Sequence, residues 1–423
     1  MSKPSLVQKL GIKYPIIQSP MAGVSTIEMA SSVTNKGGLG SIPLSTLNFL
    51  ESESIDKLKE MIAKYRSQLN DKSLYHVMNL NLFCHDIVEE PNEKQFENWK
   101  NLYKKTLSQY GHDFDKVIND INFQNGNISF KEIEKNENSI NKLIDLLIEI
   151  KPKVISFHFG FPSRKTIAKL QKNGIMIFVT ATSVAEVNEL YYWHEKWPFK
   201  RSPYEINLID GIILQGSEAG GHRGNFLDPD SQDEYLSTKS LFIKSKNYLD
   251  YTLGIDEIPF LIPTGGIMDS SSISWYLNNE ADAVQLGTIF LATPESTTSS
   301  YFSNLHYPLS QETIMTKLIS GKQARCIKTT FIRNIIKNYE ESKEDLPPYG
   351  WSYFGYKSLL AKLYYYITHV TFDEGEDIRF NLCGSNHFLI DDSLTTNEIM
   401  DKLIRGLIID EDEKIINLKK RKI

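Results

Sequence analysis

The feature that most constrains the fold is a repeat of short apolar runs, rich in β-branched and aromatic residues, that alternate with stretches of helical periodicity. Eight such runs lie at residues 15–19, 39–43, 75–83, 154–157, 175–180, 209–214, 258–263 and 283–286. Strands that alternate with helices form a parallel sheet, because parallel neighbours need a long crossover connection. Eight repeats over roughly 300 residues favour a closed barrel over an open sheet. We therefore expect an α/β fold of the TIM-type (β/α)8 barrel class.

The alternation is interrupted twice, which predicts a second unit beside the barrel. Residues 85–150 are rich in Asn, Lys, Glu and Gln, and we interpret them as helices with a long surface loop, an expansion without a chemical role. Beyond residue 293 the pattern changes again, and an aromatic-rich helical stretch appears. The predicted organisation is a barrel over residues 1–300 with the insertion at about 85–150, a helical cap over 301–392, and a closing barrel helix and tail over 393–423.

Several of the predicted helices begin with a capping signal. Ser25 precedes Glu28 by three positions, and Ser183 precedes Glu186 by three, which is the capping-box pattern. Asp269 is expected to cap the helix that follows the seventh strand.

Composition excludes several classes of protein. Hydrophobic residues make up 41% and charged residues 24% of the 423 residues, as in an ordinary globular protein. The formal net charge of −6 argues against a general nucleic-acid binder. The sequence contains no apolar run of about 18 residues, so no membrane span is predicted. Residues 1–5 lack the apolar core of a secretory signal.

The cysteines point to a reducing compartment. Cys84, Cys326 and Cys383 are odd in number and far apart, and they form no CxxC pair, so neither a zinc site nor a disulfide framework is indicated. We expect a cytoplasmic protein without a bound metal. The basic run at residues 419–422 is interpreted as a solvated end rather than a sorting or nucleic-acid signal.

Glycine-containing loops follow the last two strands. Gly265 and Gly266 follow the seventh strand, and Gly287 and Thr288 follow the eighth, which is the standard phosphate position of a TIM barrel. Backbone amides at such loops can hold a phosphate without a lysine. The alternative is that these residues only make tight turns. Two adjacent loops with the same signal favour phosphate binding.

Other strand ends carry groups that suit a flat ring system. Residues 20–23, which include Met21 and Ala22, could lay backbone against a ring. Asn81 and Gln215, at the ends of the third and sixth strands, have amide side chains that could bond a heterocycle's edge, unless loop groups already satisfy them. Together with the glycine loops, these residues suggest a phosphorylated aromatic cofactor across the barrel top.

One histidine stands out among nine because it lies in a glycine loop. His222 falls within residues 214–224, where it could exchange a proton near neutral pH. His158, at the end of the fourth strand, is a candidate for substrate contact or for a structural bond to a neighbouring loop; His85 and His387 are weaker candidates. Tyr349 belongs to an aromatic cluster that could line a pocket or fill a core.

These residues carry a resemblance to the nitronate monooxygenase family, formerly called 2-nitropropane dioxygenases. Six motifs occur in order, at residues 17–23, 81–83, 156–160, 215–224, 265–267 and 285–288. The resemblance covers residues from about 5 to 295 and fits the branch that retains the Glu-Ala-Gly-Gly-His motif at residues 218–222, with insertions similar to those of fungal members. The cap is similar more loosely, through residues 320–325 and 384–386.

The resemblance implies a barrel that binds FMN, with His222 as the catalytic residue. It implies FMN contacts at Met21, Ala22, Asn81, Gln215, Gly220, Gly221, Gly265, Gly266, Gln285, Leu286, Gly287 and Thr288. His158 and Tyr349 become substrate candidates, and no metal is required. In this family the flavin takes an electron from a nitronate, O2 is reduced, and a carbonyl compound and nitrite are released. Propionate 3-nitronate is an expected substrate.

Two roles are open for His222, and two other functions remain open for the chain. A protonated or hydrogen-bonding His222 could hold an anionic nitronate, whereas a neutral one could take the α-carbon proton of a nitroalkane. The same scaffold could instead serve an NAD(P)H-dependent enoyl or quinone reductase; no second GxGxxG motif follows a strand, but such reductases need none. A barrel that has lost its cofactor is the third reading, against which the cofactor loops and His222 argue.

Overall fold

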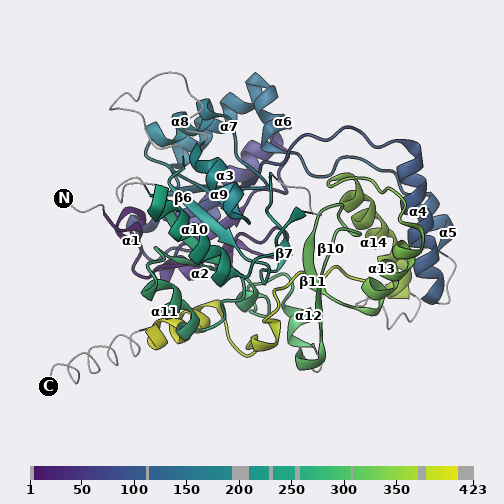
Figure 1. The fold of residues 1–423 in the computed structure, drawn as a ribbon. Coiled ribbons are helices and arrows are strands. Elements are labelled where there is room, and N and C mark those ends of the chain that lie inside the picture. The colour runs from purple at the N-terminus through teal and green to yellow at the C-terminus, as the bar shows by residue number, and fades with distance from the viewer. Residues whose placement is uncertain are drawn as a thin grey trace.

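A computed structural model describes most of the chain. The described residues are 4–110, 114–192, 209–227, 232–252, 258–305, 308–369 and 378–407. Figure 1 shows two units side by side: a barrel wrapped by helices, and a second unit that contains α4, α5, α13 and α14.

The barrel contains the eight predicted parallel strands. They are β1 (Ile16–Gln18), β2 (Gly40–Pro43), β3 (Met78–Phe83), β4 (Val154–His158), β5 (Met176–Ala181), β6 (Gly211–Gln215), β8 (Phe260–Thr264) and β9 (Val284–Leu286). Their order in the sheet is β1-β9-β8-β6-β5-β4-β3-β2. A parallel bridge between Ile17 and Leu39 closes the ring, and the Gln18 N–H donates to the Leu39 carbonyl oxygen at 2.9 Å. The expected TIM barrel is confirmed.

Helices cover the outside of the barrel. They are α2 (Ile27–Asn35), α3 (Glu53–Ser67), α6 (Phe130–Lys135), α7 (Glu137–Ile150), α8 (Arg164–Lys172), α9 (Val184–Tyr192), α10 (Thr238–Thr252) and α11 (Ser270–Asn278). A helix over residues 396–407 completes this layer and buries Met400 and Leu403 against it. Thr395 and Glu398 exchange hydrogen bonds at its start, so the predicted closing helix is present.

Side chains inside the barrel change from apolar to polar along the strands. The short helix α1 (Leu6–Leu10) closes the amino-terminal end, where Phe178, Ile213 and Ile262 pack in one cluster. Two positions further along the same strands stand Thr180, Gln215 and Thr264. Because successive side chains of a strand face opposite ways, both sets point into the barrel. The fold therefore brings polar groups to its carboxyl-terminal mouth.

Two of the three capping predictions need correction. Thr26, not Ser25, caps α2, since its hydroxyl accepts from the Met29 N–H at 3.1 Å. The Glu186 N–H does donate to Ser183, but its carboxylate accepts from Thr182 instead of completing the box. Asp269 caps α11 as predicted.

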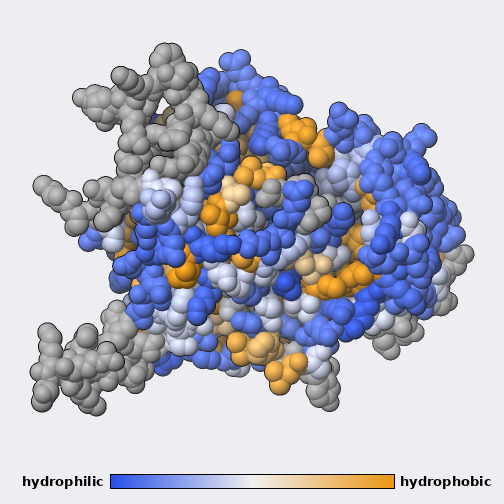
Figure 2. All heavy atoms as spheres, in the orientation of Figure 1, coloured by the Kyte–Doolittle hydropathy of each residue, from blue (hydrophilic) through white to orange (hydrophobic). Residues whose placement is uncertain are grey.

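Residues 93–121 of the insertion contain predicted helices that help to build a second core. Helices α4 (Glu93–Leu107) and α5 (Asp115–Asn119) pack with α13 (Thr330–Ser342) and α14 (Trp351–His369) around a second hydrophobic cluster. Trp99 is fully buried and stacks on Tyr103, with ring centroids 3.8 Å apart. The face of this unit that Figure 2 shows is largely hydrophilic, and such a polar composition gives little sign of a buried face. We propose that the cap comprises residues 93–121 as well as 301–392.

The cap also contains strands, which the sequence patterns did not predict. Strands β10 (Thr313–Thr316) and β11 (Ala324–Ile327) form an antiparallel pair, and β11 continues onto β7 (Gly221–His222), the loop that carries the candidate histidine. The cap is therefore hydrogen-bonded directly to the barrel mouth. The remaining short elements are α12 (Ser299–Ser303) and the 3-10 turns η1 (Lys72–Leu74), η2 (Ser108–Tyr110), η5 (Thr288–Phe290), η6 (Pro308–Ser310) and η7 (His387–Leu389).

The described residues contain no helix long and apolar enough to cross a membrane. Within the same ranges, no group of three or more His, Cys, Asp or Glu side chains is placed to hold a metal ion. Cys84, Cys326 and Cys383 are buried free thiols.

Candidate active site

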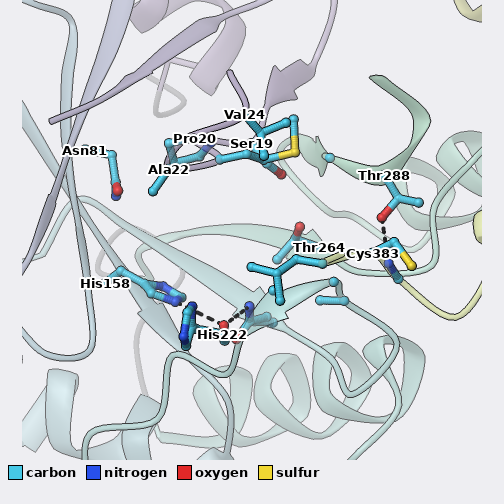
Figure 3. A pocket seen from close by; sticks show the side chains of 18 of the residues that line it. Ser19, Pro20, Ala22, Val24, Asn81, His158, His222, Thr264, Thr288 and Cys383 are labelled. Carbon is cyan, nitrogen blue, oxygen red and sulfur yellow. Dashed lines mark hydrogen bonds between the residues drawn. The ribbon is translucent and has the colours of Figure 1, made fainter. Parts of the chain in front are cut away.

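A cavity of about 390 Å³ opens between the barrel mouth and the cap. Barrel residues Asn81, His158 and Thr264 and the cap residue Cys383 surround it in Figure 3. Fourteen of the fifteen residues predicted for the site line it: Met21, Ala22, Asn81, His158, Gln215, Gly220, Gly221, His222, Gly265, Gly266, Gln285, Gly287, Thr288 and Tyr349.

Leu286 is the exception. It is 1% exposed and packs in the hydrophobic cluster between the barrel and its helices. Gln285 points into the cavity, so the next side chain along the strand must face the opposite way. Only the backbone of Leu286 is near the site, where its carbonyl oxygen accepts from the Ser19 N–H at 2.7 Å.

The glycine loops after β8 and β9 present unpaired backbone donors. Gly265 and Gly266 have φ angles of 116° and 70°, in the region that favours glycine. In the ranges that the structure describes, the backbone N–H groups of Gly266, Ile267, Gly287 and Thr288 donate to no other residue. We call these four N–H groups the nest, because unpaired backbone donors in adjacent loops can attract an anion. The loops can therefore hold a phosphate group.

The two amide side chains that were predicted to bind the ring differ in how many of their polar atoms already form hydrogen bonds. Gln215 uses both ends of its amide on the His222 loop: its nitrogen donates to the His222 carbonyl oxygen at 3.0 Å, and its oxygen accepts from the Gly224 N–H at 2.8 Å. The Asn81 nitrogen donates to the Ser156 hydroxyl at 3.0 Å. By contrast, the side-chain oxygen of Gln285 is buried and has no partner among the described residues. The side-chain oxygens of Asn81 and Gln285 are therefore the amide groups left to bond a bound group.

His222 is held by the cap through a defined hydrogen bond. Its Nε2 lies 2.9 Å from the Ser320 hydroxyl oxygen, and that hydroxyl donates to the Lys322 carbonyl oxygen at 2.9 Å. Because the serine proton is used on Lys322, the serine oxygen accepts from His222 and the imidazole carries its proton on Nε2. The Nδ1 atom has no hydrogen-bond partner in the described ranges, so its lone pair remains for a ligand.

The imidazole of His222 is neutral near pH 7. Burial lowers its pKa from 6.5 to about 3, with further lowering from His158, Lys322 and Lys357. The rings of Tyr349 and Tyr353 meet it edge-on, with centroids 5.3 and 5.6 Å away. This apolar surrounding explains why the charged form is disfavoured.

His158 supports the His222 loop. Its Nε2 lies 3.2 Å from the His222 carbonyl oxygen and its Nδ1 lies 3.0 Å from the Thr180 hydroxyl, as dashed lines in Figure 3 show in part. Burial lowers its pKa to about 4. With both ring nitrogens engaged, the structural reading of His158 fits better than a direct substrate contact. His85 packs against Tyr349, and His387 is buried within η7, so neither lies on the cavity wall.

A cationic group that the sequence analysis missed also lines the cavity. Lys357 projects from α14, and its ammonium nitrogen lies 4.0 Å from the centroid of the Tyr353 ring. Desolvation lowers the pKa of this ammonium group. Tyr349, Tyr353 and Lys357 are spaced by four residues, a helical spacing that could have grouped them on one face. Three cap residues and one residue of the insertion also line the cavity and were not predicted: Cys383, Gly384, Asn386 and Asn127.

Comparison with known proteins relates the whole chain to one family. The family model for nitronate monooxygenase matches residues 3–406. A Saccharomyces cerevisiae protein, whose name assigns it provisionally as a nitronate monooxygenase, is 43% identical over 95% of this chain and 92% of its own length. A nitronate monooxygenase of Paraburkholderia phytofirmans is 34% identical over 78% of this chain and 77% of its own.

Solved structures share the fold. A nitroalkane oxidase from Streptomyces ansochromogenes superimposes with a TM-score of 0.72 at 22% identity, covering 96% of this chain and 99% of the other. FabK from Thermotoga maritima superimposes with a TM-score of 0.59 at 19% identity, covering 99% of this chain and 100% of the other.

Proposed function

The chain belongs to the nitronate monooxygenase family, and from that premise we propose that it binds FMN and uses O2 to oxidise alkyl nitronates, such as propionate 3-nitronate, to a carbonyl compound and nitrite. Membership of the family makes it a flavin-dependent oxidoreductase that acts on a small molecule. The observation that carries the finer proposal is the geometry of His222, a neutral base with one free nitrogen beside an anion-binding nest and a cation.

The residues present fit FMN. The unpaired N–H groups of Gly266, Ile267, Gly287 and Thr288 would hold its phosphate. Met21, Ala22 and the unpartnered amide of Gln285 would hold the ring system. When bound, FMN supplies the electron transfer and the reaction with O2 that no side chain can perform.

The cap wall suits a negatively charged substrate. Lys357 brings a positive charge to the cavity, and the Tyr349 hydroxyl is buried without a partner in the described part of the chain. A nitronate carries its charge on oxygen, and a carboxylate at its far end adds a second charge. Lys357 would therefore favour a nitronate that also bears a carboxylate over an alkyl nitronate without one.

The protonation of His222 favours its role as a base. Because Nε2 donates to Ser320, Nδ1 presents a lone pair to the cavity. That lone pair can accept the α-carbon proton of a neutral nitroalkane, which would generate the nitronate in the cavity. The buried surroundings keep the imidazole neutral before this step, and the nitronate anion formed beside it would offset the cost of the charge that the imidazole gains. We therefore propose that neutral nitroalkanes are accepted in addition to nitronates.

Anaerobic flavin reduction tests the proposal against the reductase alternative. FMN-loaded protein is mixed without O2 with propionate 3-nitronate in one sample and with NAD(P)H in another, and the visible flavin absorption is followed. Bleaching by the nitronate but not by NAD(P)H supports the proposal. Rapid bleaching by NAD(P)H with none by the nitronate would make the chain a reductase instead.

A further inference from the structure

A short segment of the cap lies across all three glycine loops of the barrel mouth. We name residues 383–386 the clasp. The Gly384 N–H donates to the Thr288 hydroxyl oxygen at 2.9 Å, which is the contact drawn beside Cys383 in Figure 3. The Ser385 N–H donates to the Glu218 carbonyl oxygen at 3.0 Å. The Asn386 side-chain nitrogen donates to the Gly266 carbonyl oxygen at 2.7 Å. Each bond holds a loop that follows a different strand.

The clasp fits against the barrel backbone without space for side chains. A Cβ atom on Gly220 would lie 2.4 Å from the Cys383 carbonyl carbon and 2.5 Å from the Gly384 nitrogen. A Cβ atom on Gly384 would lie 2.7 Å from the Glu218 carbonyl oxygen. Glycine at both positions allows this close approach. The fit shows that the clasp is a built part of the barrel mouth.

Asn386 donates a hydrogen bond to the peptide group between Gly266 and Ile267, whose N–H is one of the four donors of the nest. In a trans peptide the carbonyl and the N–H point in opposite directions. With the Gly266 carbonyl oxygen bound to Asn386, the N–H of Ile267 points away from the clasp, and it is one of the unpaired donors of the nest. Gly266 has a φ of 70°, and because glycine can adopt many backbone conformations, the bond from Asn386 restricts the loop to this one.

We infer that Asn386 is a positioning residue for the cofactor phosphate: the cap, through Asn386, fixes the Gly265–Gly266 loop in the conformation that binds it. This inference rests on the proposed binding of FMN. The barrel supplies the donors, whereas a residue more than a hundred positions further along the chain keeps them aligned. Tight retention of FMN therefore requires a docked cap.

Paired flavin titrations test the inference, because riboflavin has the ring system of FMN but no phosphate. Apoprotein is titrated with each flavin, and quenching of flavin fluorescence gives both dissociation constants. For Asn386→Ala we expect FMN to bind about tenfold more weakly, as for one lost hydrogen bond, and riboflavin to bind within about twofold of wild type. Asn386→Asp, which adds a negative charge at the same point, is expected to weaken FMN further and again to spare riboflavin.

Ser385→Ala is the matched control, because the clasp bond of Ser385 comes from its backbone N–H, which alanine retains. It is expected to bind both flavins like wild type. Unchanged riboflavin binding also shows that a variant is folded. Wild-type affinity of Asn386→Ala for FMN would overturn the inference, and so would an equal loss of FMN and riboflavin. A wild-type protein that binds neither flavin would overturn the proposed function itself, and the inference with it.

Discussion

The Nε2 atom of His222 lies 2.9 Å from the hydroxyl oxygen of Ser320. His222 belongs to a barrel loop, and Ser320 belongs to the cap, just before β11. The bond assigns the imidazole proton to Nε2 because Ser320 in turn donates to Lys322. The cap thus determines which nitrogen of His222 carries the proton and which one keeps a free lone pair.

Substitution of His222 tests the catalytic role directly. In His222→Asn, FMN should remain bound because no cofactor contact is assigned to the imidazole, whereas turnover should fall at least about 100-fold, as when a proton-accepting group is lost. The flavin content of the purified variant and its kcat on nitroethane measure the two effects. Full activity in a flavin-loaded variant would remove His222 from the mechanism.

Substitution of Ser320 tests the positioning role of its hydroxyl. In Ser320→Ala, His222 loses the acceptor for its Nε2 proton, and we expect kcat to fall about tenfold while KM and flavin affinity stay near wild type. Ser320→Thr retains the hydroxyl and should recover much of the rate. A loss in Ser320→Ala that Ser320→Thr does not reduce would show that packing, rather than the hydrogen bond, is responsible.

The pH dependence of kcat/KM follows from the lowered pKa of His222. A histidine with a pKa of about 3 stays neutral as the pH falls through 6.5, so the base remains active well into the acidic range. With a substrate that does not titrate there, we expect a flat profile from about pH 8 to about pH 5. An inflection near pH 6.5 would contradict the buried, neutral imidazole.

The lowered pKa values of His158 and His222 also make the folded protein less stable in acid, so folding must be monitored while the pH profile is measured. The unfolded chain binds protons at His158 and His222 below about pH 6.5, whereas the folded chain does so only near pH 4 and below. The free energy of unfolding should therefore decrease from about pH 6.5 downward. Circular dichroism at each pH separates this loss of folded protein from a change in the base.

The residue after His222 makes a buried ion pair that should dominate local stability. The Arg223 guanidinium donates to Asp233 at 2.8 Å and also to the Gln215 carbonyl oxygen at 2.7 Å, and both charged side chains are buried. Arg223→Met leaves a buried carboxylate unpaired and should reduce the free energy of unfolding by about 3–5 kcal/mol. The double variant Arg223→Met, Asp233→Leu should recover part of the loss in urea unfolding. No recovery would mean that the backbone bonds of Arg223, not the pair, provide the stability.

The barrel was predictable because its signal is local and repeated. Each strand is a short apolar run followed by a helix, so every run could be recognised without knowledge of its neighbours. The sequence does not show which side chains of a strand point into the barrel and which point outward, because both faces of the strands are buried. That is why Leu286 was assigned to the site together with Gln285, although its side chain packs outside the barrel.

The parts of the site that come from the cap could not be predicted, because they depend on contacts between distant segments. Composition indicated helices and a long surface loop over residues 85–150, but it gave no sign that one face of α4 and α5 packs against α13 and α14. Gln215 could be placed at the barrel mouth, but not its use in holding the His222 loop. Lys357 and Asn386 reach the cavity only through the docking of the cap.

Oxygen uptake by the FMN-loaded protein on addition of propionate 3-nitronate, without any nicotinamide, tests whether the chain oxidises nitronates. We expect rapid uptake with release of nitrite, and strong loss of both in His222→Asn. Folded, flavin-loaded protein that consumes no oxygen with the nitronate would show that the chain is not a nitronate monooxygenase.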